Sequence, residues 1–344
     1  MYSRSKIYIN TIAIFTVLAF FPLIGKAEAK KSDAKVPIEL TRGMDTLSVE
    51  LDGTYVKESE DELTLLEESG RDDISKQSFT FNDKLSTVEI LKAETIKKDG
   101  RRISVKPEQI RLQEEPASIG APMFTTSKVK TIIFPDVEVG DRVFYHVRRT
   151  QQVAPLPGHF SYFDYFGPNG QVRDYKLVLN TPELMTMHFS QQGMVELPER
   201  TIDGRKIKSW TFQQRRPRSV DDGKANMLLN EPHFMISSMD SWQRLAVAYQ
   251  ARAQDKVVVT PEIQRLADEV TRGTSDRREQ VSKLYDWVRD NIRYVALYVA
   301  DGGYVPHYSE EILHNRYGDC KDHVVLLEAL LKAKGIASHG ALVS

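Results

Sequence analysis

The single cysteine of this 344-residue chain, Cys320, has the surroundings of a reactive thiol. It follows Gly318 and Asp319 and precedes an apolar stretch whose periodicity predicts a helix that ends at Gly335. With Asp319 as the N-cap, the thiol occupies the first helical position, where free backbone N–H groups and the helix dipole stabilise a thiolate. A thiolate in this place suits acyl transfer, because a free N–H can also bind the developing oxyanion. Cys320 is therefore the candidate catalytic residue.

A lone cysteine also has simpler explanations. With one thiol the chain cannot form an internal disulfide, so Cys320 can equally be a small buried side chain or an intermolecular link. The neighbouring charges act in both directions, because Lys321 supports a thiolate whereas Asp319 and Asp322 oppose it. The residues alone leave the nucleophile and the buried hydrophobic side chain as open alternatives.

Four histidines near the cysteine in sequence are candidates for a base or a metal ligand. His323 lies three positions after Cys320, close enough for contact but poorly placed to approach the thiol from the substrate side. We expect His307 and His314 to be ordinary loop or surface residues, and His339 to begin a final strand. Their spacing matches no recognised zinc pattern, so we predict no metal and no cofactor.

Several other function classes are disfavoured by the sequence. It contains no GxxxxGK, GxGxxG, HExxH or GxSxG motif, which argues against nucleotide and serine-hydrolase chemistry. The balance of 47 basic and 48 acidic residues leaves no electrostatic footprint for nucleic acid or an anionic membrane. Aromatic residues at 159–166 can form a sugar or peptide platform, but packing inside a β-rich domain is the favoured interpretation.

The elements that must position Cys320 have a helical period. Residues 241–253 are compatible with a helix, Pro261 behind Thr260 predicts a helix before Gly273, and Asp276 predicts a capped helix that reaches about residue 292. A strand is expected at 293–299 and an irregular segment at 304–317. The predicted buried faces of the last two helices comprise Val281, Leu284, Tyr285, Val288 and Ile292, and Val324, Leu327, Leu330 and Leu331.

Residues 39–214 have the short alternating apolar runs of a β-rich domain. Asp99-Gly100 and Asp203-Gly204 predict turns between strands, and Val139-Gly140-Asp141 separates two further runs in a similar way. Many strands without intervening helices indicate a β-sandwich or an open barrel. Small and basic residues predict a linker at 215–240, so we expect an α+β chain with a β-sandwich-like domain before a second domain at 241–344.

The first residues have the features of an export signal. Arg4 and Lys6 precede an apolar run at about 12–24, and Ala27-Glu28-Ala29 is a small-x-small cleavage pattern, which predicts a signal peptide at 1–29. The run is shorter than the roughly 20 residues of a membrane span, so no integral span is expected after cleavage. An uncleaved anchor is the alternative. Both interpretations predict an exported protein, in the periplasm or otherwise outside the cytoplasm.

The cysteine segment resembles a known family. Tyr317-Gly318-Asp319-Cys320-Lys321-Asp322 and the following LLEALLKAKGI resemble the nucleophile segment of bacterial transglutaminase-like proteins, which are related to papain-like cysteine peptidases. Residues 285–295 and 302–303, and Pro306 together with residues 310–313, match the same core in order and spacing. Residues 132–147, the aromatic run after Gly158 and residues 242–252 resemble the β-rich domain of unknown function that precedes this core in exported bacterial proteins.

The resemblance implies that Cys320 attacks an amide carbonyl of a protein or peptide, giving a thioester that water or an amine resolves by hydrolysis or crosslinking. It also implies a His and an Asp on strands beyond the cysteine helix. Residues 338–343 have the pattern of the first such strand, and the chain ends at Ser344 before the other positions, so we expect a truncated core. The alternative function is a non-catalytic periplasmic binding or envelope-assembly module with a remnant core.

Overall fold

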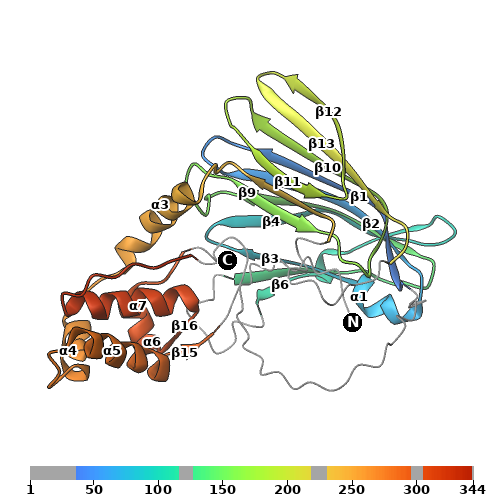
Figure 1. Ribbon diagram of the computed structural model, residues 1–344. Coiled ribbons are helices and arrows are strands. Elements are labelled where there is room, and N and C mark those ends of the chain that lie inside the picture. Colours follow the sequence, from blue (N-terminus) through green and yellow to red (C-terminus); the bar gives the residue numbers. More distant parts are fainter. Residues whose placement is uncertain (1–35, 116–126, 218–230, 296–304, 343–344) are drawn as a thin grey trace, which may run out of the picture.

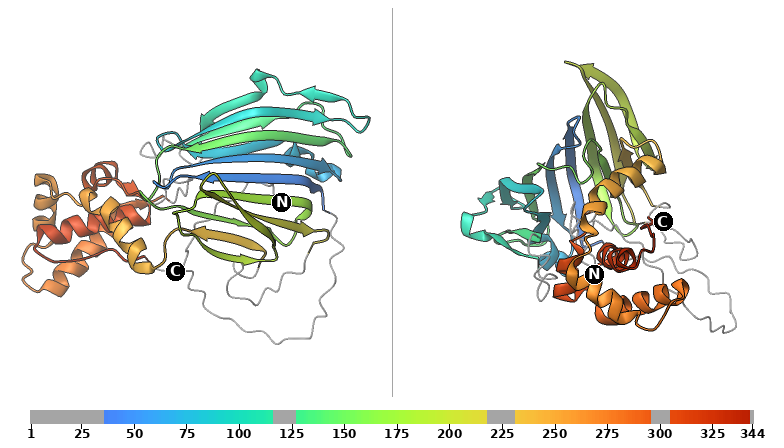
Figure 2. Two further views of the ribbon diagram at one scale, coloured as in Figure 1. Left: turned by 90° about the horizontal axis from the view of Figure 1, so that it is seen from above. Right: turned by 90° about the vertical axis from the view of Figure 1, so that its left-hand side faces the viewer.

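The protein has a mixed α+β fold, which confirms the predicted class. The computed structural model describes residues 36–115, 127–217, 231–295 and 305–342, so the predicted signal peptide lies outside the described residues. Strands make up the first part and helices the last, and the views agree in placing the helical part at one end of the strand-rich part (Figures 1 and 2). Within the described ranges, no helix is long and apolar enough to cross a bilayer.

The described strand-rich part is built from a large sheet and two small ones. The eight-stranded sheet has the order β12-β13-β10-β1-β2-β8-β4-β5, which comprises Val195–Ile202, Arg205–Gln214, Gln171–Pro182, Ile38–Val49, Tyr55–Leu65, Arg142–Gln151, Ser86–Ile96 and Arg102–Ser104. The three-stranded sheets are β3-β7-β6, with Lys76–Asn82, Ser127–Ile133 and Ile110–Glu114, and β11-β14-β9, with His188–Gln192, His233–Ser237 and Ser161–Tyr165. The strand β1 pairs with β10 in parallel and with β2 antiparallel.

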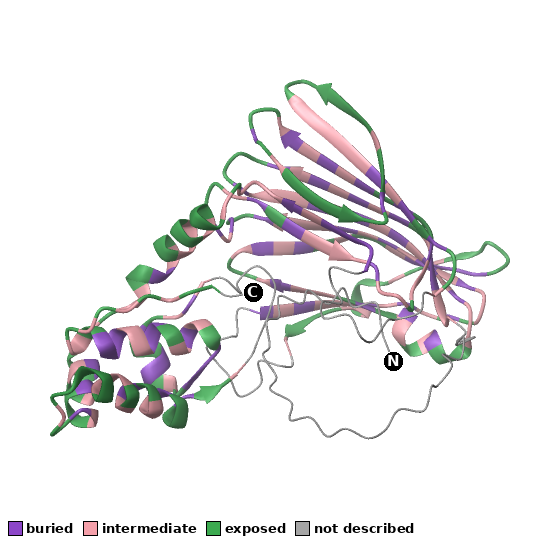
Figure 3. Ribbon diagram, in the orientation of Figure 1, coloured by how far each residue is buried: buried purple, intermediate pink, exposed green. Residues whose placement is uncertain are grey.

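One face of the large sheet is buried beneath the two small sheets. Buried residues alternate with more exposed ones along β1, β2 and β10, as expected for strands with one covered face (Figure 3). Phe79 on β3 contacts Tyr145 on β8 with ring centroids 5.4 Å apart, and Trp210 on β13 contacts Phe234 on β14 at 4.4 Å. These contacts give the sandwich-like arrangement that the alternating runs predicted.

A buried polar network crosses the inner face of the large sheet. Lys57 Nζ on β2 lies 2.9 Å from Asp45 Oδ2 on β1 and donates to the Tyr162 hydroxyl at 2.9 Å. The hydroxyls of Ser59 and Tyr175 donate to the same Asp45 carboxylate, at 2.5 and 2.9 Å. Burial raises the pKa of Tyr175 well above its usual value, so this phenol stays a donor. Because a buried charge is costly without its partners, the network holds β1, β2 and β10 in one register.

The predicted turns had different outcomes. Asp99-Gly100 connects β4 to β5 and Asp203-Gly204 connects β12 to β13, and Asp203 and Gly204 have φ angles of 51° and 73°, as a tight hairpin requires. The interpretation of residues 139–141 as a similar hairpin turn was wrong, because β7 and β8 lie in different sheets. Residues 139–141 are part of a crossing between these sheets.

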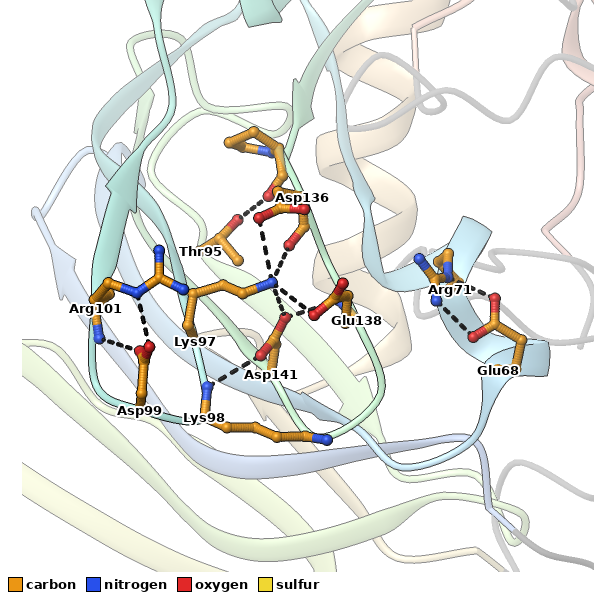
Figure 4. Close-up of polar contacts among 11 residues, drawn as sticks. Glu68, Arg71, Thr95, Lys97, Lys98, Asp99, Arg101, Asp136, Glu138 and Asp141 are labelled. Carbon is orange, nitrogen blue, oxygen red and sulfur yellow. Dashed lines mark hydrogen bonds and ion pairs between the residues drawn. The ribbon is translucent and has the colours of Figure 1, made fainter.

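Lys97 holds this crossing against the turn after β4 (Figure 4). Its Nζ lies 2.7 Å from Asp141 Oδ2, 3.3 Å from Asp136 and 3.2 Å from Glu138. The Asp141 carboxylate also accepts the backbone N–H of Glu138 at 2.8 Å and that of Lys98 at 3.0 Å. Hydrogen bonding to Asp141 raises the pKa of Lys97. Burial acts to raise the pKa of Asp141, but the Lys97 contact and the backbone hydrogen bonds of Glu138 and Lys98 together outweigh burial and lower that pKa.

The predicted linker at 215–240 is only partly described. Residues 218–230 lie outside the described residues, whereas β14 at 233–237 is the central strand of the sheet β11-β14-β9. The strand-rich part therefore extends beyond residue 214, because β14 covers Trp210. Phe160, Tyr162 and Phe166 are buried, so these members of the aromatic cluster at 159–166 serve packing, as favoured from the sequence.

The helical part contains α3 (Trp242–Ala253), α4 (Pro261–Val270), α5 (Arg277–Asn291), α6 (Ser309–Asn315) and α7 (Cys320–Ala333). The predicted N-caps Thr260 and Asp276 are confirmed, because their side chains accept backbone N–H groups of α4 and α5. Ser241 caps α3 in the same way. The prediction of an irregular segment at 304–317 was wrong, since α6 forms there. The predicted strand at 293–299 is described only as β15 (Arg293–Tyr294), which pairs in parallel with β16 (Tyr317–Gly318).

The helix α7 lies at the centre of the helical core and contacts α4, α5 and α6. Its buried stripe comprises Asp322, Val325, Leu326, Ala329, Leu330 and Leu331. The prediction that Val324 and Tyr285 are buried was wrong, because their side chains are 39% and 53% exposed. Relative to the predicted face, the buried stripe of α7 is rotated by about one residue position, because Asp322 faces inward at the first turn of the helix. Residues 338–342 form no strand and return along α7, with Gly340 close to Val324.

Lys97→Met tests whether the crossing depends on the buried cation. The variant leaves the buried Asp141 carboxylate without its cation, so we expect the free energy of unfolding to fall by about 2 kcal/mol. Urea denaturation of the whole chain measures this change. Lys84→Met, at an exposed position before β4, is the matched control, and an equal effect of both variants would contradict the assignment.

Candidate active site

Cys320 is the first residue of α7 and its side chain is exposed. The Asp319 carboxylate caps the helix, accepting the backbone N–H of Lys321 at 3.1 Å and that of Asp322 at 3.3 Å. The predicted position of the thiol at a capped helix start is therefore confirmed. Because the thiol is exposed, packing beneath the helix does not explain it.

The buried carboxylate of Asp322 organises the backbone on both sides of the thiol. Its Oδ1 accepts the backbone N–H of His307 at 2.9 Å, and its Oδ2 lies 3.1 Å from His307 Nδ1. The same carboxylate accepts the Asp319 N–H at 3.2 Å, which completes a reciprocal capping box. From the sequence, Asp322 had been considered only as a charge that opposes a thiolate.

The environment of Asp322 favours its ionised form. Complete burial alone would raise the pKa of this carboxyl group. The hydrogen bonds and charge of His307, together with the charge of Lys321, outweigh burial and hold the pKa below its usual range. Asp322 is therefore a carboxylate that fastens the loop at residues 305–308 to the amino end of α7.

Gly318 is required by the position of Asp322. A Cβ atom at residue 318 would lie 2.5 Å from the Cβ of Asp322 and 2.9 Å from its Oδ2, closer than real side chains approach. On the other side, the Gly318 carbonyl accepts the N–H of Val295 at 2.9 Å in the short β15–β16 pairing. The Gly-Asp-Cys-x-Asp pattern is thus one packed unit in which the glycine gives room to the second aspartate.

The histidines nearest the thiol in sequence are engaged elsewhere. His323 Nδ1 lies 2.8 Å from the Asp319 carbonyl oxygen, and its Nε2 lies 3.1 Å from that of Ile292, so the ring ties α5 to α7. His307 contacts Asp322, as described above. The structure thus brings His323 and His307 to the amino end of α7 without freeing either for the thiol. No group of three or more metal-binding side chains gathers within the described ranges.

Tyr249 on α3 is a residue of this region that the sequence did not single out. Burial raises its pKa to about 12, and the negative charges of Asp319, Cys320 and Glu328 add to the effect. These three residues belong to α7 or to its N-cap. The helical face shared by Trp242, Leu245 and Tyr249 was visible in the sequence, but it did not reveal which element the face covers.

A groove of about 610 Å³ lies beside α7, on the side of Val324. Tyr285 and Ile292 of the α5 region and Tyr294 of β15 form one wall, and Val324 and Leu327 of α7 form another. Val324 follows Cys320 by four residues and so lies on the same side of the helix. Cys320 does not itself line the groove, which also carries charged side chains such as Arg289 and Asp290.

Two family models match the chain. The Domain of Unknown Function DUF3857 matches residues 51–219, and the Transglutaminase-like superfamily matches residues 264–340, which include Cys320 and all of α7. The predicted resemblance to both parts is therefore confirmed. The second match supports a papain-like hydrolase or transferase in general terms. A search of the curated proteins found no match to this chain.

Solved structures support the fold. A "putative protease" from Parabacteroides distasonis is 19% identical, with a TM-score of 0.75, and the match covers 88% of this chain and 60% of that protein. This chain thus spans about three fifths of the length of that relative. An M1 zinc metallopeptidase from Deinococcus radiodurans matches 58% of this chain and 42% of its own at 11% identity, but a TM-score of 0.29 is too low to support any argument.

Gly318→Ala tests the packed unit around the thiol. The added methyl group meets Asp322 at the buried helix start, so we expect the free energy of unfolding to fall by about 1–3 kcal/mol. Gly167→Ala is the matched control, because a Cβ there meets nothing within 4 Å. Chemical denaturation followed by Trp fluorescence compares the two, and equal stability of both variants would refute the steric assignment.

Asp322→Asn tests the buried carboxylate through its pH dependence. The folded-state pKa is lowered, so its stabilisation is present above the unfolded-state value of about 3.9 and is lost as the pH falls through the folded-state value. At pH 7 we expect the free energy of unfolding of the variant to be lower by about 3–5 kcal/mol, as when one partner of a buried ion pair is removed. Urea titrations should show that the difference in unfolding free energy between the variant and the unmodified chain becomes smaller below about pH 4.

Asp268→Asn is the control for this experiment, because Asp268 is an exposed carboxylate that pairs with Lys334 and accepts a hydrogen bond from Gln264. We expect the control to have little effect at any pH. A stability difference for Asp322→Asn that stays constant across the acid range would contradict the assigned role.

Proposed function

For a chain that joins a DUF3857 domain to a transglutaminase-like core, we propose thiol acyl transfer on amide bonds of proteins or peptides through Cys320. The observation that carries the proposal is the exposed thiol at the capped start of α7, inside the segment that matches the superfamily. An exposed thiol at a helix amino end is where nucleophilic chemistry is favoured.

The proposed reaction has two steps. In the first, the Cys320 sulfur forms a bond to the amide carbonyl carbon, the C–N bond breaks, and the amine leaves after gaining the proton that the thiol lost. In the second, water or another amine attacks the thioester and returns the thiol. Water as the acceptor gives hydrolysis, and an amine gives a crosslink.

The amino end of α7 supplies one donor for the oxyanion. The Asp319 side chain accepts the N–H groups of Lys321 and Asp322, and the Asp319 carbonyl accepts that of His323. The Cys320 N–H makes no hydrogen bond within the described part of the chain. It is adjacent to the sulfur and is therefore available to the carbonyl oxygen of a bound substrate.

A non-catalytic binding or envelope-assembly module is the second candidate. The observation in its favour is that the rings of His323 and His307 are hydrogen-bonded to groups other than the Cys320 thiol. A thiol without a base retains little of its rate. In this alternative the strand-rich part binds a partner and the helical part serves as its support.

We also propose that the protein acts outside the cytoplasm. The support is the basic start, the short apolar run and the Ala27-Glu28-Ala29 pattern of the first residues. A single cysteine is compatible with an oxidising compartment, because it forms no internal disulfide there.

Cys320→Ala distinguishes the two candidate functions. We expect the unmodified chain to release peptides from fluorescent casein or to attach a fluorescent amine to casein. In the variant we expect the rate of that reaction to be at least about 100-fold lower. Matching thermal unfolding of both chains is the control for folding. Turnover that persists in the variant would contradict a role for the thiol, and the absence of both activities from the unmodified chain would favour the binding module.

A further inference from the structure

We propose that the groove beside α7 binds peptide substrates through the carboxylate of an acidic side chain, which Arg293 and Arg316 receive. This inference rests on the proposed acyl transfer and names its substrate class, a peptide that carries Asp or Glu close to the amide bond that Cys320 attacks. Both arginines line the groove, one from β15 and the other from the position before β16.

Positive charge predominates among the described residues that line the groove. They include the guanidinium groups of Arg289, Arg293 and Arg316 and one carboxylate, that of Asp290. The carboxylate is already paired, because Arg289 donates to it from Nε at 2.7 Å and from Nη2 at 2.9 Å. Arg293 and Arg316 therefore leave the groove with a net positive charge, which favours an anionic ligand.

Backbone pairing holds the two arginines next to each other. The Arg293 N–H donates to the Arg316 carbonyl oxygen at 2.8 Å, at the start of the parallel pairing of β15 with β16. The strand β16 in turn lies against α6 and α7 (Figure 1). Because a carboxylate accepts hydrogen bonds from two guanidinium groups at once, a ligand of that kind relieves the repulsion between these two cations.

Aromatic rings support both guanidinium groups. The guanidinium carbon of Arg316 lies 5.0 Å from the centroid of the Trp287 ring, and that of Arg293 lies 5.5 Å from the centroid of the Tyr317 ring. A cation held over a ring face has less freedom to lose when it binds a ligand. Arg316 also lines a second groove, of about 640 Å³, with Glu269 of α4. It forms no ion pair with a carboxylate of the described residues, so its charge is available.

The groove leads from these arginines toward the thiol. Val324, which lines the groove, follows Cys320 by about one helical turn, or about 6 Å along the axis of α7. Arg316 precedes Cys320 by four residues, so their Cα atoms lie at most about 14 Å apart. An extended peptide covers this distance with about four residues. The acidic side chain is therefore expected within about four residues of the amide bond that Cys320 attacks.

Peptide binding to the full chain tests this site. The probes are two rhodamine-labelled, C-terminally amidated heptapeptides, one of alternating Ala and Glu and the other with Gln in place of Glu. We expect fluorescence anisotropy to show about tenfold tighter binding of the Glu peptide to the unmodified chain. We expect Arg316→Gln, and independently Arg293→Gln, to remove this preference. Matching thermal unfolding of the variants and the unmodified chain is the control for folding.

Arg265→Gln is the matched control, because Arg265 is exposed on α4 and lines neither groove, and we expect it to keep the preference for Glu. Equal binding of the two peptides, binding of neither, or an equal loss of preference in Arg265→Gln would overturn this inference and leave the role of Cys320 standing. If the Glu peptide binds as expected but the unmodified chain neither cleaves nor crosslinks casein, the proposed acyl transfer is overturned and the groove remains a site for acidic peptides.

Discussion

The amino end of α7 depends on one buried carboxylate, that of Asp322. It accepts the backbone N–H groups of His307 and Asp319 and also contacts the His307 ring, so it joins the preceding loop to the helix start. A buried carboxylate is tolerated only when such donors surround it. Its inward position explains the missing side chain at Gly318, the rotation of the buried stripe of α7 and the outward position of Cys320.

The same physical rule shapes the strand-rich part. Lys57 and Asp45 on the inner face of the large sheet, and Lys97 and Asp141 at the sheet crossing, are buried charges that pair with each other. Each pair joins elements that apolar packing alone would leave free to slide, because hydrophobic contact has no direction whereas a hydrogen-bonded charge has one. These pairs therefore determine register and crossing geometry.

A hydrogen bond from α3 joins the helical part to the strand-rich part. The helical part supplies the thiol and one backbone donor, and Arg252 of α3 donates to the Ala154 carbonyl oxygen of the strand-rich part. An acyl-transfer site gains most from donors that are fixed before the substrate arrives.

The sequence by itself determined the local structure around the thiol. Asp319 as the N-cap, the helix from Cys320, the caps at Thr260 and Asp276, and the turns at Asp99-Gly100 and Asp203-Gly204 all follow from interactions within a few residues, which a sequence displays directly. The α+β class and the resemblance to two families were predicted for the same reason, since periodicity and motifs are local patterns.

Only the tertiary structure decided which partners meet across the chain. Residues 139–141 cross between sheets because Asp141 meets Lys97, β14 joins the strand-rich part because it covers Trp210, and Val324 faces outward because Asp322 faces His307. A residue's spacing shows which face it shares, but only packing shows what that face meets.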